Sequence, residues 1–137
     1  MSLHWKNISA VGFGAVIGTI SRYTLHLVTV NPNYPYGTLI VNIVGSGLLG
    51  FITALFLVFV PKEWVKAGLG VGFCGGFTTM STLAADAYIL FDTFSIFQSA
   101  LYIIGSVIGG LLAALCGYLL GNHYSARLKK RFEVKRG

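Results

Sequence analysis

The sequence predicts an all-α integral membrane protein with four transmembrane helices in a single domain. Charged residues make up only 10% of its 137 residues, whereas soluble domains carry about 25%. Long apolar stretches follow one another with short gaps between them. A hydrocarbon core about 30 Å thick needs about 20 apolar residues in a helix. Four stretches of this chain reach that length.

The four predicted spans are separated by short polar segments. The first gap, residues 31–36, contains two prolines and two asparagines, which favour a turn. Trp64, in the second gap, is typical of an interfacial anchor, and Thr93 or Ser95, in the third, can cap the helix that follows. The predicted spans cover residues 8–30, 37–60, 65–91 and 96–121, and a basic tail covers residues 122–137.

The positive charges lie on one side of this arrangement. An even number of spans places both termini and the second gap on the same side, and nine of the ten Lys and Arg residues fall there. The positive-inside rule then predicts a multi-pass protein of the cell membrane with both termini in the cytoplasm. The nine are Lys6, Lys62, Lys66, Arg127, Lys129, Lys130, Arg131, Lys135 and Arg136.

The basic tail allows two interpretations. A cluster of Lys and Arg after the last span favours a topology anchor that contacts anionic lipid headgroups. The same cluster is also found in nucleic-acid-binding arms. Because the chain shows no aromatic or helix-turn-helix pattern for base recognition, we expect the lipid bilayer, and not nucleic acid, as the partner of the tail.

Glycines spaced four apart predict close helix packing. The pairs include Gly14 with Gly18, Gly68 with Gly72, and Gly105 with Gly109. In lipid, small residues at this spacing let helix backbones approach each other. The pattern therefore predicts a tight bundle, and one that assembles into an oligomer because four short spans enclose little interior.

The third span contains a polar stretch at membrane depth. Residues 74–82 include Gly75 and Gly76, followed by four hydroxyl side chains. Non-helical backbone at this depth is tolerated only where protein or a cavity satisfies it. The glycines permit the helix to break, and we expect the carbonyls of residues 75–79 then to face inward, at an ion-binding centre. The alternative is a flexible but continuous helix whose Thr and Ser hydroxyls bond to their own turn.

Five further polar residues within the spans are candidate functional residues, because polar groups at this depth are costly. Arg22 either snorkels to the interface or provides a positive field that attracts anions. Asn42 either joins helices or lines a polar path. Asp86 either pairs with Arg22 or takes part in ion handling. Tyr102 and Ser106 share one helix face and can both donate an O–H.

These residues resemble motifs of the bacterial fluoride-specific ion channels of the CrcB or Fluc family. The matching motifs are Gly-Thr-Ile-Ser-Arg-Tyr at 18–23, Gly-Thr-Leu-Ile-Val-Asn-Ile-Val-Gly-Ser at 37–46, Gly-Phe-Cys-Gly-Gly-Phe-Thr-Thr-Met-Ser-Thr at 72–82, and Tyr102 with Ser106. The resemblance covers about residues 8–121. The second and third motifs are specific as a pair.

The resemblance implies an antiparallel dimer with two fluoride pores along its interface. It implies a structural sodium ion, which is not transported, on backbone carbonyls of Gly75 and Thr78. It further implies that Asn42, Tyr102 and Ser106 lie along the pore. Arg22 matches the family's first-helix arginine, and Asp86 falls where the family carries an acidic residue.

One departure from the family pattern concerns two pore phenylalanines, whose positive ring edges can face an anion. Met80 and Leu83 stand at these positions. The strong charge bias is a second departure, since an antiparallel homodimer requires one chain to insert both ways. We therefore expect either a homodimer or a heterodimer with a paralogous chain of opposite orientation that supplies the phenylalanines.

The function predicted from these observations is a passive, fluoride-selective anion channel that exports cytoplasmic fluoride and lowers its toxicity. Asn42, Thr79, Tyr102 and Ser106 supply N–H and O–H donors that can replace the ion's hydration shell. The alternative is a small multispan transporter, or a structural or regulatory membrane protein with a lipid- or nucleic-acid-binding tail. An enzyme is not expected, because no nucleophile–base set or metal cluster is visible in the sequence.

Overall fold

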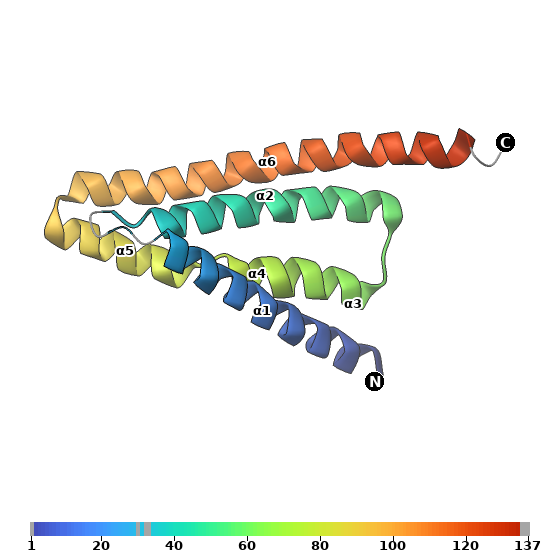
Figure 1. Ribbon diagram of the computed structural model, residues 1–137, viewed down its shortest axis with the longest axis horizontal. Coiled ribbons are helices and arrows are strands. Elements are labelled where there is room, and N and C mark those ends of the chain that lie inside the picture. The colour runs from blue at the N-terminus through green and yellow to red at the C-terminus, as the bar shows by residue number, and fades with distance from the viewer. Residues whose placement is uncertain (1, 30, 32–33, 135–137) are drawn as a thin grey trace.

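The computed structural model describes residues 2–29, 31 and 34–134, and nearly all of them are helical (Figure 1). Part of the predicted first gap and the end of the tail, residues 135–137, lie outside the described residues. The elements in order are α1 (Ser2–Val28), α2 (Tyr36–Phe59), α3 (Glu63–Lys66), η1 (Ala67–Cys74), α4 (Gly75–Phe77), α5 (Met80–Thr93) and α6 (Ile96–Val134).

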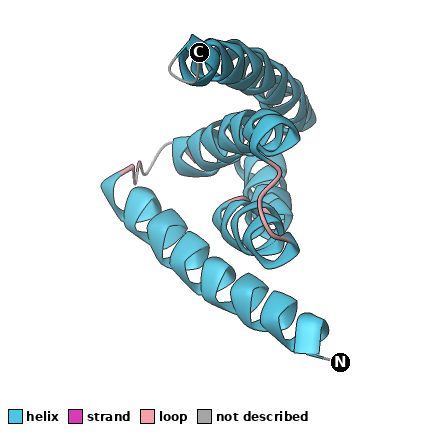
Figure 2. Cartoon of the chain, turned by 90° about the vertical axis from the view of Figure 1, so that its right-hand side faces the viewer, coloured by secondary structure: helices cyan, strands magenta, loops and turns pink. Residues whose placement is uncertain are grey.

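The helices lie along one common direction. In Figure 1, α1, α2, α6 and the row from α3 to α5 each run along the bundle, and both termini lie at the end that carries the α2–α3 connection. Figure 2 shows α2 between α6 and the row from α3 to α5, with α1 on the far side of that row. This arrangement agrees with the alternating direction predicted for the four segments.

Three of these helices are long and apolar enough to cross a membrane, counting only the described residues. They are residues 4–28 of α1, all of α2, and residues 96–129 of α6. The row from Glu63 to Thr93 has no single helix of that length, because it is interrupted after Phe77. The coarse prediction of an all-helical membrane protein is therefore confirmed.

The last helix is longer than predicted. The sequence predicted that the span ends at residue 121, but α6 has 39 residues and continues to Val134. At about 1.5 Å per residue it extends for about 58 Å, well beyond a hydrocarbon core of about 30 Å. The described part of the basic tail is therefore a continuation of the helix. At the other end of α6, the Ser95 hydroxyl accepts a hydrogen bond from the backbone N–H of Gln98 at 3.2 Å, as the predicted cap requires.

Glycines bring α1 against η1 and α4, as the spacing predicts. A Cβ atom added to Gly72 would lie 2.6 Å from the carbonyl oxygen of Val11, and one added to Gly76 would lie 2.6 Å from that of Ala15. Real Cβ atoms do not approach backbone so closely, so only glycine fits at these positions. Gly121 of α6 meets Phe51 of α2 in the same way, at 2.6 Å.

The segment from Ala67 to Cys74, η1, has π-helical hydrogen bonding. Wider π turns are uncommon and occur frequently at functional sites, because they place residues out of the regular α-helical register. The sequence reading did not predict this element. Here it immediately precedes the interruption of the row.

The buried interior of the chain is small. One buried apolar cluster consists of Leu83, Ala87 and Leu90 of α5 with Tyr102 of α6. Many large apolar side chains elsewhere are exposed, including Phe13 at 70% and Leu111 at 70%. Such faces are typical of helices that contact lipid or a second subunit.

Candidate functional site

The row of helices breaks at Thr78 and Thr79, and not at the glycines. Both threonines are extended, with φ/ψ of −77°/161° and −151°/127°. Gly75 is helical, at −67°/−36°, so the residues that leave the helix are the threonines and not the glycines that were expected to permit the break. Position 76 requires glycine for a different reason, because this residue packs directly against the backbone of α1. The predicted break exists, but it begins three residues after Gly75.

Asn42 of α2 holds the break through the backbone of Thr79. Its Oδ1 accepts from the Thr79 N–H at 2.8 Å, and its Nδ2 donates to the Thr79 carbonyl at 2.9 Å. Both residues are buried, with exposures of 9% and 8%. One amide side chain therefore satisfies both backbone groups of a residue that has left the helix, which is what an apolar surrounding requires. Asn42 thus joins α2 to the broken row of helices, and it also lines a cavity beside the break.

The Thr79 side chain caps the helix that follows. Its Oγ1 accepts from the Thr82 N–H at 3.2 Å and lies 3.0 Å from the Thr82 hydroxyl. Since α5 begins at Met80, this is the N-cap position. The Thr78 hydroxyl instead donates back to the Cys74 carbonyl at 3.0 Å. The two adjacent threonines therefore end one helix and start the next.

These hydrogen bonds release two carbonyl oxygens. In a continuous α-helix the Thr79 N–H would donate to Gly75, but here it donates to Asn42. Likewise the Thr82 N–H would donate to the Thr78 carbonyl in a continuous helix, but here it donates to the Thr79 hydroxyl. The carbonyls of Gly75 and Thr78 thereby lose their i+4 partners.

Arg22 of α1 reaches one of these oxygens. Its Nη1 donates to the Thr78 carbonyl at 3.3 Å, and the side chain is half-buried. Within the described part of the chain no ion pair joins Arg22 to Asp86, so the structure does not contain the pairing that the sequence analysis left open. Arg22 also lines a cavity of about 230 Å³ together with Thr38, Thr79 and Thr82. We call this hollow the arginine cavity.

A larger hollow, the central groove, lies on the other side of the break. Its volume is about 650 Å³. Most of the predicted site residues line it, namely Asn42, Gly75, Thr78, Thr79, Met80, Leu83 and Ser106. Met80 is 72% exposed, whereas Leu83 is 3% exposed and belongs to the apolar cluster. The structure therefore brings together residues from α2, α4, α5 and α6 that are far apart in the sequence.

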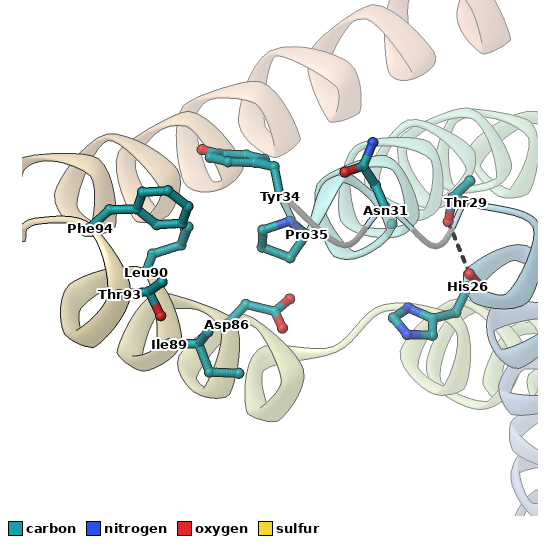
Figure 3. Close-up of a pocket in the computed structure, with 11 residues that line it drawn as sticks. His26, Thr29, Asn31, Tyr34, Pro35, Asp86, Ile89, Leu90, Thr93 and Phe94 are labelled. Carbon is teal, nitrogen blue, oxygen red and sulfur yellow. Dashed lines mark hydrogen bonds between the residues drawn. The ribbon is translucent and has the colours of Figure 1, made fainter.

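A third cavity, the loop pocket, lies where the α1–α2 linker meets the end of α5. Figure 3 shows His26 of α1 and the Asp86 carboxylate of α5 pointing into it, below Tyr34 of the linker. Its volume is about 410 Å³. Partial burial raises the pKa of Tyr34 above its ordinary value, with a smaller contribution from Tyr36, so the phenol stays protonated at neutral pH.

Asp86 accepts hydrogen bonds from two other helices. The Thr38 hydroxyl of α2 donates to its Oδ2 at 2.6 Å, and the Tyr102 hydroxyl of α6 donates to the same oxygen at 2.9 Å. Tyr102 also lies 3.1 Å from the Pro35 carbonyl, so its single proton has two acceptors. Tyr102 is 1% exposed and does not line the central groove, whereas Ser106 does. The two residues share a helix face, but of the two only Ser106 lines one of these three hollows.

Thr38 is the residue that the sequence reading missed. It is 2% exposed, lines the arginine cavity and binds Asp86. A signal for it was present, because Thr38, Asn42 and Ser46 are spaced four apart on an otherwise apolar helix. That spacing gives α2 one polar stripe directed at the break.

Comparison with known proteins gives a family match over most of the chain. The family described as CrcB-like protein, Camphor Resistance (CrcB), matches residues 9–118. A relative from Halalkalibacterium halodurans, named fluoride-specific ion channel FluC 2, is 56% identical over 125 residues, which cover 91% of this chain and 92% of the relative.

More distant relatives carry similar names. Fluoride-specific ion channel FluC 2 of Bacillus subtilis is 38% identical and covers 85% of this chain and 88% of its own length. Fluoride-specific ion channel FluC of Nitrobacter winogradskyi is 34% identical, with coverages of 84% and 94%. The resemblance inferred from the four motifs is thereby confirmed.

Proposed function

Because this chain belongs to the CrcB family of membrane proteins, we propose that it is a fluoride-selective channel through which cytoplasmic fluoride leaves the cell passively. Fluoride is proposed as the conducted ion because the relatives are named fluoride-specific ion channels. A negative cell interior drives anions outward, so export needs no coupled reaction. Its benefit to the cell is a lower concentration of toxic fluoride.

The observation that carries this proposal is the break at Thr78 and Thr79. Fluoride is small and strongly hydrated, so a pore must offer N–H and O–H donors in place of water. Asn42 uses one of its two amide hydrogens on Thr79, which leaves the other for the central groove. The Ser106 hydroxyl lines the same groove. A continuous helix would offer neither the opening nor the freed backbone groups.

Shared lining residues connect the three hollows into one path. His26 lines both the loop pocket and the arginine cavity, and Thr79 lines both the arginine cavity and the central groove. Thr38 and Asp86 are joined by a hydrogen bond at the first of these boundaries. Arg22 provides a positive charge beside the middle hollow, which favours anions over cations. We propose that fluoride crosses the protein along this series.

The row from α3 to α5 is the fourth membrane crossing in this proposal. It runs along the bundle beside α1 and α2, and its broken backbone is satisfied by Asn42 and Arg22. Broken helices of this kind are tolerated in membranes where protein or a cavity covers them. With it, the chain crosses the bilayer four times, and the charge bias places both termini in the cytoplasm.

A second subunit would close the central groove. Gly75 and Met80 are exposed on it, and a Cβ atom added to Gly75 would meet no atom within 4 Å. An open groove of this size cannot conduct a hydrated anion selectively while it faces lipid. We therefore propose a dimer whose subunits are antiparallel and meet across this face.

The proposed structural sodium ion fits two oxygens of the break. The carbonyls of Gly75 and Thr78 have lost their helical partners, and hard cations prefer such oxygen ligands. Arg22 occupies one lone pair of the Thr78 oxygen and leaves the second. If the ion has four carbonyl ligands, this chain supplies two of them, and the equivalent two carbonyls of the second subunit supply the others. The ion would neutralise converging carbonyl dipoles where the subunits meet.

The partner is proposed to be a paralogous chain inserted in the opposite direction. This chain has Met80 and Leu83 where the family pattern has phenylalanines, and nine of its ten basic residues lie on one side. Three relatives, from H. halodurans, B. subtilis and Bacillus licheniformis, are numbered 2 in their names, as one chain of a pair would be. A homodimer remains the alternative outcome of the test.

The test is fluoride efflux from liposomes, measured with a fluoride electrode. The chain is reconstituted alone and then together with its paralogue of opposite charge bias from the same genome. The heterodimer proposal predicts rapid efflux from the mixture and little from either chain alone. Rapid efflux from this chain alone would instead establish a homodimer, and no efflux from any combination would refute the channel.

A further inference from the structure

A fourth pocket, separate from the central groove, the arginine cavity and the loop pocket, lies at the opposite end of the bundle from the loop pocket. Four side chains define it. Trp5 and Lys6 belong to the start of α1, Lys62 belongs to the α2–α3 connection, and Trp64 belongs to α3. Its volume is about 650 Å³. It lies at the end of the bundle that carries both termini (Figure 1).

Neither lysine of this pocket has an acidic partner in the described part of the chain. The nearest acid in sequence, Glu63, is 3.4 Å from Lys66 in an i, i+3 ion pair. The pocket therefore brings two ammonium groups from segments 56 residues apart in the sequence into one hollow without a counter-charge. Two like charges in one place are unfavourable unless an anion joins them.

The two tryptophans are not used by the fold. Trp5 is 68% exposed and Trp64 is 44% exposed. Indole rings prefer the membrane interface, where the ring contacts acyl chains and the N–H contacts headgroups. Ile8, three residues after Trp5 and 60% exposed, continues an apolar face from the pocket toward the hydrocarbon. The pocket is thus basic at one edge and apolar at the other.

We propose that Trp5, Lys6, Lys62 and Trp64 form a binding site for the headgroup of an anionic phospholipid. The lysines bind the phosphate and any further negative charge, and the Ser9 hydroxyl is a donor in the same hollow. The indole rings pack against the glycerol and the first methylene groups. A bound lipid would link α1 to the α2–α3 connection, whatever ion the protein conducts.

The sequence provides an internal probe, because Trp5 and Trp64 are the only tryptophans of the chain. Its tryptophan fluorescence therefore arises entirely at the pocket. The full chain is reconstituted in vesicles that contain either brominated phosphatidylglycerol or brominated phosphatidylcholine, since bromine quenches only indoles in contact with the lipid. We expect phosphatidylglycerol to quench more strongly, with a several-fold higher relative binding constant.

Substitutions of the lysines then test whether the preference for phosphatidylglycerol arises at this pocket. Each lysine at an anionic surface favours binding by up to about fivefold, so K6Q/K62Q should remove the several-fold preference and bring the relative binding constant close to one. K6R/K62R should keep the preference. The matched control is Lys129→Gln on α6, which removes a basic residue of the same side but not of the pocket and should leave the preference unchanged.

Three results would overturn the proposal. The first is equal quenching by the two lipids in the unmodified chain. The second is a preference for phosphatidylglycerol that survives K6Q/K62Q. The third is a preference that is lost in Lys129→Gln, which would assign lipid binding to the basic tail. Circular dichroism of each variant shows whether the helices are intact, so misfolding is distinguished from loss of the site.

Discussion

Replacement of Asn42 by alanine removes the side chain that satisfies both backbone groups of Thr79. The two hydrogen bonds are 2.8 and 2.9 Å long, and both residues are buried. Each buried group left without a partner costs about 1–3 kcal/mol, so Asn42→Ala should destabilise the broken segment by about 2–6 kcal/mol. The lower value already changes the equilibrium between the broken and rearranged segment by about 30-fold.

The assay is the initial rate of fluoride efflux from liposomes that contain the conducting assembly. We expect Asn42→Ala to lower this rate by about tenfold or more, because the segment rearranges and the path through the break is lost. The matched control is Thr53→Ala on the same helix, whose hydroxyl donates only to the Leu49 carbonyl one turn before it. Efflux that is equal in Asn42→Ala and Thr53→Ala would refute the reasoning.

Four further substitutions test other features of the structure. Gly76→Ala places a methyl group 2.6 Å from a carbonyl oxygen of α1 and should lower the free energy of unfolding by about 1–3 kcal/mol. Gly12→Ala is the control, because a Cβ atom at Gly12 meets no atom within 4 Å, and it should lower that free energy far less. Equal losses in the two variants would contradict the close packing of α1 against Gly76. Met80→Phe should raise fluoride efflux by the mixture of this chain with its oppositely inserted paralogue, since Met80 is 72% exposed on the groove. Leu83→Phe, at a site only 3% exposed, should instead lower thermal stability. The opposite pattern would exclude the proposed role of the missing rings. Tyr102→Phe removes one of the two donors to the Asp86 carboxylate and should lower efflux several-fold, with Tyr118→Phe on the same helix as the control. An unchanged rate would show that conduction does not depend on the hydrogen bond from Tyr102 to Asp86.

The sequence predicted the helical segments well because each depends on local composition. Apolar length and the polar gaps placed the ends of α2 within one residue of their observed positions, at Tyr36 and Phe59. The Ser95 cap was predicted for the same reason. The end of α6 was missed, because the fall in hydropathy after residue 121 reports where lipid ends and not where helical hydrogen bonding ends.

The break shows what local reasoning cannot supply. The two glycines suggested a flexible backbone, but the structure shows that position 76 needs glycine because the backbone of α1 packs against it. The break instead depends on Asn42, which is 37 residues away from Thr79 in the sequence. The bond from Thr38 to Asp86 spans 48 residues and was missed for the same reason. Sequence patterns pointed to several residues that lie around the break, but their pairing is decided by the tertiary packing of α2 against the row from α3 to α5.

The central claim is that the hydrogen-bond donors and the opening at Thr78 and Thr79 conduct fluoride selectively. The most direct test compares fluoride and chloride efflux from identical liposomes that contain this chain together with its oppositely inserted paralogue. We expect rapid fluoride efflux, strongly reduced by Asn42→Ala, and little chloride efflux. Equal efflux of the two anions, or fluoride efflux that does not depend on Asn42, would contradict it.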